Sequence, residues 1–423
     1  MIKLCIFNHT FQKPEFYRRW KLLAEKYTDV DVTLLAPTDW TWGGDKGLTY
    51  GTVEVLQGKL VDEERFRIHL VGIKETNHGG WVSEQMEQEI SQLRPDIFYY
   101  IGGHNDLALM KIYDIKRKYK LNHMKIMVFG MRGHTHALRL EKSNNPIRMA
   151  KNIAKYSVFK SRLNRLNRHS AAIFCHFPVA VDEFRREGYK GPVYMQTQVG
   201  VDIDVFRPNP EARNRIREKY NIGDAYLFGS ASRFTSDKGL SEVIAALPQE
   251  GNWKYLMMGW GRDDEVEKIK REIAERGLED KIILTGFIKT WAEMAEHWNA
   301  LDCAVHTPLT TELWEETFSL ALVQAMATGL PVIGSSSGSV PYQLGSEGII
   351  VPERDINALN NQFMIMMADP DYGREIGQKM LHRATSCFST RHLNDCFYNT
   401  VKDILAGIYD ENKIDMTKYL VEE

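Results

Sequence analysis

Short apolar runs alternate with amphipathic segments along most of the first half of the chain. The runs are rich in Val, Ile, Phe and Tyr: KLCIF, DVTLLAP, RIHLVG, DIFYYIGG, KIMVFG, AAIFCH and PVYMQT. Between them, segments such as PEFYRRWKLLAEKY and VSEQMEQEISQLR repeat their apolar residues every three or four positions, which predicts helices with one buried face. Because buried strands that alternate with helices form parallel sheets, the pattern predicts a doubly wound α/β domain.

The same pattern restarts after residue 224. Further apolar runs, AYLFGSA, KYLMMG, KIILTG, CAVHT, PVIG and GIIV, are again separated by helical segments. A polar stretch with Pro and Gly, residues 199–224, lies between the two halves and predicts an interdomain linker. We therefore expect two Rossmann-like domains, 1–198 and 225–390, that face each other across a cleft. The last segment, 391–423, predicts a long amphipathic helix that is followed by a polar tail.

The bulk composition is that of an ordinary globular protein. With 423 residues, of which 43% are apolar and 26% charged, the chain is long enough for two domains and unlike a fibrous or disordered one. Its apolar runs are too short for a signal peptide or a membrane span, which predicts a cytoplasmic protein. The five cysteines have no paired spacing, so neither a disulfide framework nor a zinc site is expected.

The net charge of −2 conceals a strongly basic segment. Residues 111–170 hold 16 Lys and Arg but only two acidic residues. Within this segment, residues 149–168 combine cations with apolar residues at helical spacing, which predicts a basic amphipathic helix. Such a helix suits an anionic membrane surface or a lipid-phosphate acceptor, and a solvated charged helix is the alternative. Nucleic acid would use the same phosphate electrostatics, but no nucleic-acid-binding motif accompanies the charge.

Two loops in the second half carry candidate phosphate-binding groups. In SRFTSDKGL, Arg233 and Lys238 come directly after a predicted strand. A planar guanidinium beside a compact ammonium suits a diphosphate, whereas two ordinary surface cations are the alternative. In GWGR, Gly259 and Gly261 end the next strand and would let a ligand approach the backbone, although a lone Gly-x-Gly is more often a turn.

The segment EETFSLALVQAMATGLPVIG predicts a helix over 317–328 that leads into a short buried strand. Glu316, just before this helix, either complements the helix dipole or accepts hydrogen bonds from sugar hydroxyls. The following segment, SSSGSVPYQLGSEGIIV, predicts a flexible loop that closes over a ligand or is a plain connection. The helix would begin with three free backbone N–H groups that could bind an anion, those of Thr317, Phe318 and Ser319.

Together these motifs resemble those of the retaining family-four glycosyltransferases, which have the GT-B fold. SRFTSDKGL is similar to the family's diphosphate loop, GWGR to its Gly-rich loop and ILTGFI to its base-side strand. EETFSLALVQAMATGLPVI resembles the family's double-glutamate motif, and GVDIDVFRP resembles its crossover between domains. These motifs follow one another in the family's order. The first half resembles the family only in its pattern of strands and helices.

The resemblance implies a nucleotide-diphospho-sugar donor, with a UDP-sugar favoured over a GDP-sugar, and no metal or other cofactor. It implies that Arg233 and Lys238 hold the diphosphate, that Glu316 contacts the donor sugar and that Phe287 lies beside the base. Gln324 stands where the family usually has a second glutamate and would face the ribose. Because an amide accepts a hydrogen bond without a charge, we expect ribose binding to weaken by about 1 kcal/mol.

Loops after strands of the first half carry further candidates. Arg132 and His134 follow the predicted strand that ends at residue 130, and either side chain could reach the donor across the cleft. His136 is the less favoured choice in that loop. His104, in IGGHND, follows another strand end and is a candidate contact to the acceptor. For each histidine a solvated side chain is the alternative.

The sequence therefore predicts a retaining, metal-independent hexosyltransferase of cell-surface polysaccharide biosynthesis. Its acceptor would be a glycan or a lipid-linked sugar, and it would act in the cytoplasm or on the inner face of the membrane. Three alternatives remain open: a non-catalytic sugar-nucleotide-binding subunit, a nucleotide-sugar epimerase and a transferase that acts on nucleic acid. Gln324 motivates the first alternative, as does the loop FNHTFQKPEF, which lacks the glycines usual in the family.

Overall fold

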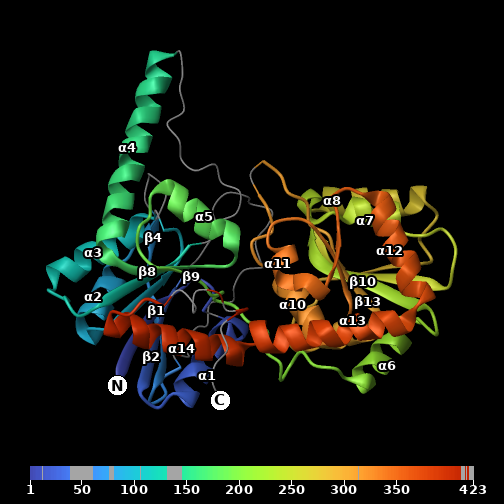
Figure 1. Ribbon diagram of the computed structural model, residues 1–423, viewed down its shortest axis with the longest axis horizontal. Coiled ribbons are helices and arrows are strands. Elements are labelled where there is room, and N and C mark those ends of the chain that lie inside the picture. The colour runs from blue at the N-terminus through green and yellow to red at the C-terminus, as the bar shows by residue number, and fades with distance from the viewer. Residues whose placement is uncertain are drawn as a thin grey trace. The chain divides into compact units, whose positions relative to one another are not determined.

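A computed structural model of the chain divides into two compact units (Figure 1). Unit 1 consists of Met1–Gln198 and Leu393–Glu423, and unit 2 consists of Val199–His392. All the strands that the apolar runs predict are present, and both sheets are parallel, so the predicted α/β fold class is confirmed. The structure describes residues 1–11, 13–38, 61–75, 81–104, 106–130, 145–312, 314–410, 415 and 417–418.

Unit 1 is built on a seven-stranded parallel sheet with the order β3-β2-β1-β6-β7-β8-β9. Its first strand, β1, lies between β2 and β6, so the sheet is doubly wound and its strand order reverses there. The strands are β1 (Ile2–Phe7), β2 (Val30–Pro37), β3 (Phe66–Val71), β6 (Ile97–Ile101), β7 (Lys125–Phe129), β8 (Ser170–Cys175) and β9 (Val193–Met195), and a separate antiparallel pair is β4 (Lys74–Glu75) with β5 (Trp81–Val82). The helices are α1 (Pro14–Lys26), α2 (Glu84–Leu93), α3 (Leu107–Lys118), α4 (Pro146–His169), α5 (Pro178–Glu187) and most of α14 (Thr390–Ala406).

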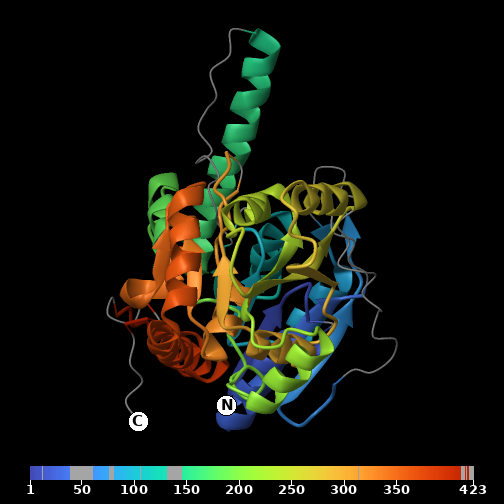
Figure 2. The ribbon, with the colours of Figure 1, turned by 90° about the vertical axis from the view of Figure 1, so that its right-hand side faces the viewer.

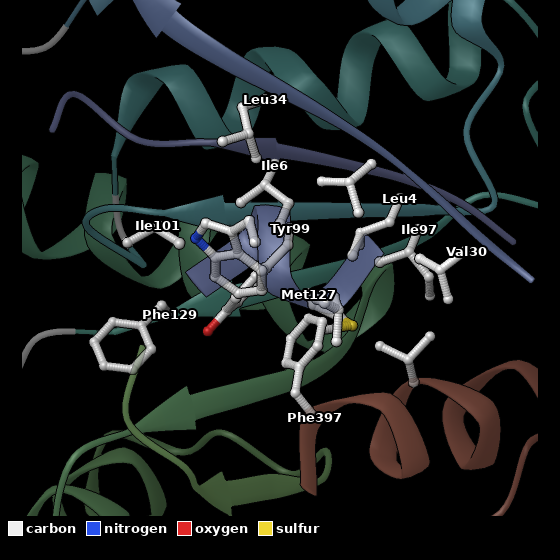
Figure 3. Close-up of a cluster of buried hydrophobic side chains, with 14 of the residues drawn as sticks. Leu4, Ile6, Val30, Leu34, Ile97, Tyr99, Ile101, Met127, Phe129 and Phe397 are labelled. Carbon is white, nitrogen blue, oxygen red and sulfur yellow. The ribbon is translucent and has the colours of Figure 1, made fainter. Parts of the chain in front are cut away.

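One face of this sheet carries the core of unit 1 (Figure 3). Alternate residues of a strand point to the same face, so Leu4 and Ile6 of β1 lie beside Ile97 and Tyr99 of β6. Phe397 of α14 points at this cluster, and its ring centroid lies 5.5 Å from that of Tyr99. The helix at the end of the chain is therefore part of the core of unit 1.

Only the C-terminal half of α4 is packed against unit 1. Phe159, Leu163 and Leu166 are buried, whereas Ile147 and Ile153 are 69% and 47% exposed. Figures 1 and 2 show the first turns of this helix extending beyond the other elements of the unit. The predicted amphipathic helix thus exists, but much of its apolar face is already used within the fold.

Unit 2 is built on a six-stranded parallel sheet with the order β12-β11-β10-β13-β14-β15. Here β10 lies between β11 and β13, which places the reversal of strand order between β10 and β13. The strands are β10 (Tyr226–Phe234), β11 (Trp253–Gly261), β12 (Ile282–Gly286), β13 (Cys303–His306), β14 (Val332–Ser335) and β15 (Ile349–Val351). The helices are α6 (Pro210–Lys219), α7 (Leu240–Ala246), α8 (Asp263–Glu275), α9 (Trp291–Ala300), α10 (Leu320–Ala327), α11 (Val340–Leu344), α12 (Ile356–Ala368) and α13 (Pro370–Arg383), with short 3-10 turns η1 (Ser236–Lys238) and η2 (Gly345–Glu347) and a π-helical turn η3 (Ala384–Phe388).

The segment 199–224, expected as a linker, belongs to unit 2. Its helix α6 is anchored to the start of β13, because Arg217 Nη1 donates to Asp302 Oδ2 at 3.2 Å and Arg213 pairs with the same carboxylate. Burial of Arg217 lowers the pKa of its guanidinium, and the charge of Asp302 partly offsets this effect.

Candidate functional site

Candidate site residues of unit 2 gather at the carboxyl ends of β10 and β13. Arg233 is the next to last residue of β10, and Lys238 ends the turn η1 that follows it. His306 is the last residue of β13, and Glu316 lies in the segment between β13 and α10. Because the strand order reverses between these two strands, this is the edge at which doubly wound sheets bind ligands.

Lys238 and Glu316, both predicted from the sequence, form a buried ion pair. Lys238 Nζ lies 3.0 Å from Glu316 Oε2, and His306 Nε2 lies 3.6 Å from the same oxygen. The ammonium of Lys238 also lies 3.9 Å from the ring centroid of Trp314, which is a cation–π contact. The side chains of Lys238 and Glu316 are only 11% and 10% exposed, so water screens their interaction weakly.

Glu316 is held in its ionised form. Burial raises the pKa of this carboxyl, but the His306 ring and the Lys238 charge outweigh burial and hold the pKa at about 2. The native state is therefore stabilised by the ionised group above pH 4.5, and this contribution is lost as the pH falls toward 2. Near neutral pH the carboxylate can only accept hydrogen bonds, as a contact to sugar hydroxyls requires.

Arg233 and three buried hydroxyl groups lie near the carboxyl ends of these strands without partners in the described part of the chain. Within the part of the chain that the structure describes, the half-buried guanidinium of Arg233 has no ion-pair or hydrogen-bond partner. Buried hydroxyl oxygens of Ser232, Thr235 and Thr307 likewise have no hydrogen-bond partner among the described residues.

The segment that carries Glu316 rests on a buried polar support. Ser339 N–H donates to the carbonyl oxygen of Glu316 at 2.7 Å, and Ser339 Oγ donates to Gln343 Oε1 at 3.1 Å. Ser337, Ser339 and Gln343 are fully buried. The prediction of a flexible loop in SSSGSVPYQLG was therefore wrong, because these polar side chains are fixed by hydrogen bonds inside unit 2.

Helix α10 begins later than predicted, at Leu320 instead of Thr317. Ser319 is its N-cap, since its Oγ accepts a hydrogen bond from the backbone N–H of Leu322 at 3.2 Å. The backbone N–H of Ser319 itself donates to Gln343 Oε1 at 2.8 Å. The prediction that three amides of the first helical turn bind an anion was therefore wrong for Ser319, and Thr317 and Phe318 precede the helix.

The two glycines of the Gly-rich loop serve the sheet itself. Gly259 and Gly261 lie inside β11 and pair with Ser232 and Phe234 of β10. A Cβ atom at Gly259 would lie 1.8 Å from the Ser232 carbonyl oxygen, and its φ of +147° also favours glycine. The predicted close approach thus occurs, but the partner is a neighbouring strand, and contact with a ligand remains a prediction.

Three further predicted residues, two in unit 2 and one in unit 1, differ from one another in burial and in their contacts. Gln324 is buried in α10, and no hydrogen bond of its side chain is found within the described residues. Phe287 is 58% exposed, with its ring edge-on to Trp260. His104 is buried in unit 1, where its Nε2 lies 3.3 Å from Glu187 Oε2. Their contacts to ribose, base and acceptor remain predictions, and Arg132 and His134 lie outside the described residues.

Sequence reasoning missed His306 and Trp314. His306 ends the apolar run CAVHT, and a polar residue at the end of a buried strand of a doubly wound sheet is a signal that could have identified it. Trp314 carried no such signal, because it approaches Lys238 only through the path of the loop. Both side chains contact predicted site residues, so they belong to the same site.

Comparison with known proteins finds a family match within unit 2. The family model described as glycosyl transferases group 1 matches residues 212–383. A GDP-mannose-dependent alpha-(1-6)-phosphatidylinositol monomannoside mannosyltransferase of Mycolicibacterium smegmatis is 29% identical over 194 residues, which cover 44% of this chain and 50% of the relative. The amylovoran biosynthesis glycosyltransferase AmsK of Erwinia amylovora is 31% identical over 170 residues, or 38% of this chain and 39% of that protein. The chain thus spans about half the length, or less, of these curated relatives.

Solved structures match nearly the whole chain. HepE of Anabaena, crystallised with UDP and glucose, has a TM-score of 0.66 and 16% identity, covering 95% of this chain and 100% of that one. The sucrose-phosphate synthase of Thermosynechococcus elongatus has a TM-score of 0.67 and 16% identity, covering 96% and 100%. At such identity the likeness concerns the fold. The match to the glycosyl transferases group 1 family thus covers residues 212–383, and the two Rossmann-like units of the chain have the GT-B fold.

Proposed function

We propose that this protein is a retaining, metal-independent hexosyltransferase that moves a sugar from a nucleotide-diphospho-sugar to a glycan or lipid-linked acceptor. The observation that carries the proposal is the buried pair of Lys238 and Glu316, together with the unpartnered guanidinium of Arg233 at the end of β10. An anion-binding group and an ionised acceptor of hydroxyl hydrogens then lie at one edge of the sheet. A nucleotide sugar needs this combination, because its phosphates are anionic and its sugar is neutral.

The cations would act mainly in the transition state. As the bond between the sugar and the diphosphate breaks, negative charge grows on the leaving phosphate, and Arg233 and Lys238 stabilise it in a site of low dielectric. The ammonium of Lys238 has three donor hydrogens, so it would share them between the diphosphate and Glu316. Glu316 would hold the sugar through its hydroxyls.

GDP-mannose is the first donor to test. The sequence alone favoured a UDP-sugar, but the relatives from M. smegmatis and Mycobacterium tuberculosis are named as GDP-mannose-dependent. A UDP-sugar stays the second choice. The names of several relatives refer to phosphatidylinositol mannoside, amylovoran, lipopolysaccharide core and O-antigen, which supports an acceptor of cell-surface glycan biosynthesis.

The test is turnover of GDP-mannose and UDP-glucose by the purified chain, with and without lipid-linked and glycan acceptors. We expect Arg233→Ala and Lys238→Ala each to lower kcat roughly 100-fold while changing donor binding less, because their effect grows with the leaving-group charge. Arg271→Ala is the matched control, since Arg271 is an exposed cation of α8 without a side-chain hydrogen bond or ion pair among the described residues. Full turnover in both site variants would contradict the proposal. Release of an isomerised nucleotide sugar without acceptor would identify an epimerase.

We further propose that the protein associates peripherally with an anionic membrane through the exposed half of α4. Residues 145–158 include Arg148, Lys151 and Lys155 but no acidic residue, and Ile147, Ile153 and Val158 are exposed among them. Cations next to exposed apolar side chains suit the headgroup region of an anionic bilayer. Within the described residues, every helix is too short or too polar to cross a membrane.

A further inference from the structure

The buried ring nitrogen Nε2 of His306 lies close to the Glu316 carboxylate. The His306 side chain is 10% exposed, and its Nε2 atom is buried without a hydrogen-bond partner among the described residues. The carboxylate oxygen Glu316 Oε2 lies 3.6 Å away. A shift of a few tenths of an ångström would bring these atoms within hydrogen-bond distance, which for N–H to O extends to about 3.2 Å.

The two oxygens of Glu316 have different surroundings. Lys238 Nζ, at 3.0 Å, and His306 Nε2 both lie next to Oε2, while no donor to Oε1 is found within the described part of the chain. One oxygen is thus anchored to the protein, and the other is available to a ligand. The anchor is shared by two elements, η1 and β13, which fixes the rotation of the carboxylate more firmly than one contact would.

Lys238 has a second task in the proposed function, because it also binds the diphosphate. When the diphosphate attracts the ammonium, the pair with Glu316 weakens and the carboxylate loses part of its anchor. His306 cannot follow the ammonium, since it is fixed at the end of a buried strand. It is therefore the contact that can keep Glu316 in place while the donor is bound.

We propose that His306 is a positioning residue, which donates from Nε2 to Glu316 Oε2 so that Oε1 stays directed at the hydroxyls of the donor sugar. This inference rests on the proposed transferase function. It assigns His306 to the orientation of the sugar during transfer and leaves the binding of the nucleotide to other groups. Loss of His306 should thus affect kcat more than donor binding.

The test compares His306→Leu with His306→Gln in the full chain, with GDP-mannose and UDP-glucose as donors. We expect His306→Leu to lower kcat about 30-fold with a change in donor KM below about threefold, in the range of a lost positioning contact. The amide nitrogen of His306→Gln can replace Nε2, so this variant should recover most of kcat. His297→Leu is the matched control, because His297 is also buried in unit 2 but bonds to Tyr220 and the carbonyl of Glu293.

Several outcomes would overturn the inference. They are an unchanged kcat in His306→Leu, a folded His306→Gln variant as slow as His306→Leu, or a loss of kcat in His297→Leu as large as that in His306→Leu. A double-mutant cycle of His306→Leu and Glu316→Gln on the melting temperature tests the contact without any activity, and strictly additive shifts would also overturn it. If the wild-type chain turns over neither donor, the proposed function fails, and the cycle still decides whether His306 and Glu316 interact.

Discussion

At the scale of single residues, Glu316 and Gln324 should respond differently to substitution. Glu316→Gln should be harmful, whereas Gln324→Glu should be tolerated. Glu316 is ionised and anchors Lys238, so Glu316→Gln removes both a buried charge and the partner of a buried ammonium. Gln324 is buried without a charged partner in the described residues, and a carboxylate there would accept ribose hydrogen bonds more strongly.

We therefore predict that Glu316→Gln lowers kcat at least about 100-fold, whereas Gln324→Glu preserves or tightens donor binding. Turnover and isothermal titration with GDP-mannose measure the two effects. Glu353→Gln serves as a control, because Glu353 accepts from Thr310 Oγ1 at 2.8 Å in the same unit but has no contact with Lys238. The reverse ranking of the two variants would show that the roles assigned to Glu316 and Gln324 are wrong.

At the scale of elements, close backbone contacts between loops hold the site together. Gly338 has a φ of +50°, and a Cβ atom there would lie 2.1 Å from the carbonyl oxygen of Glu316. An alanine would thus have to displace the segment that carries the carboxylate. Gly277 has a similar φ of +62°, but no atom of the described residues lies within 4 Å of its Cβ position.

A comparison of alanine substitutions at Gly277 and Gly338 distinguishes the effect of backbone strain from the effect of displacing the site. We predict that Gly277→Ala lowers the free energy of unfolding by about 1–2 kcal/mol through its left-handed backbone alone. Gly338→Ala should cost about 2 kcal/mol more and should also lower kcat, because overpacking against fixed backbone adds to the strain. Denaturant unfolding and donor turnover measure both. Equal losses of stability and equal activity in the two variants would mean that the site does not depend on this contact.

Sequence patterns predicted the sheets but not the polar contacts between loops. The runs around Phe98 and Met257 have the length and composition of buried strands, and such local signals are sufficient to place a strand. The start of α10 depends on Ser319 and Gln343, which are 24 residues apart, and no local pattern reports such a contact. Lys238 and Glu316 were found as separate motifs, whereas their pairing and the approach of His306 follow only from the fold.

At the scale of the whole molecule, charge is distributed very unevenly along the chain. The basic segment 111–170 stands against a net charge of −2, so the remaining chain is strongly acidic. An acidic protein is repelled by an anionic bilayer, but a local basic surface that extends beyond the fold can offset this repulsion. The exposed half of α4 is such a surface, since its cations lie next to apolar side chains that can enter the headgroup region.

The full chain should therefore bind vesicles of phosphatidylcholine and phosphatidylglycerol, and vesicles of phosphatidylcholine alone much more weakly. Each cation near the surface contributes about 1 kcal/mol, so joint replacement of Arg148, Lys151 and Lys155 by Gln should weaken binding on the order of 100-fold. The control replaces three cations of α8, Lys268, Lys270 and Arg271, by Gln and should bind as the wild type does. Binding should also fall as salt shortens the Debye length, but Ile153→Asn should weaken it at any salt concentration, because that contact is apolar. Equal losses in the α4 and α8 variants would show that net charge, and not this helix, determines attachment.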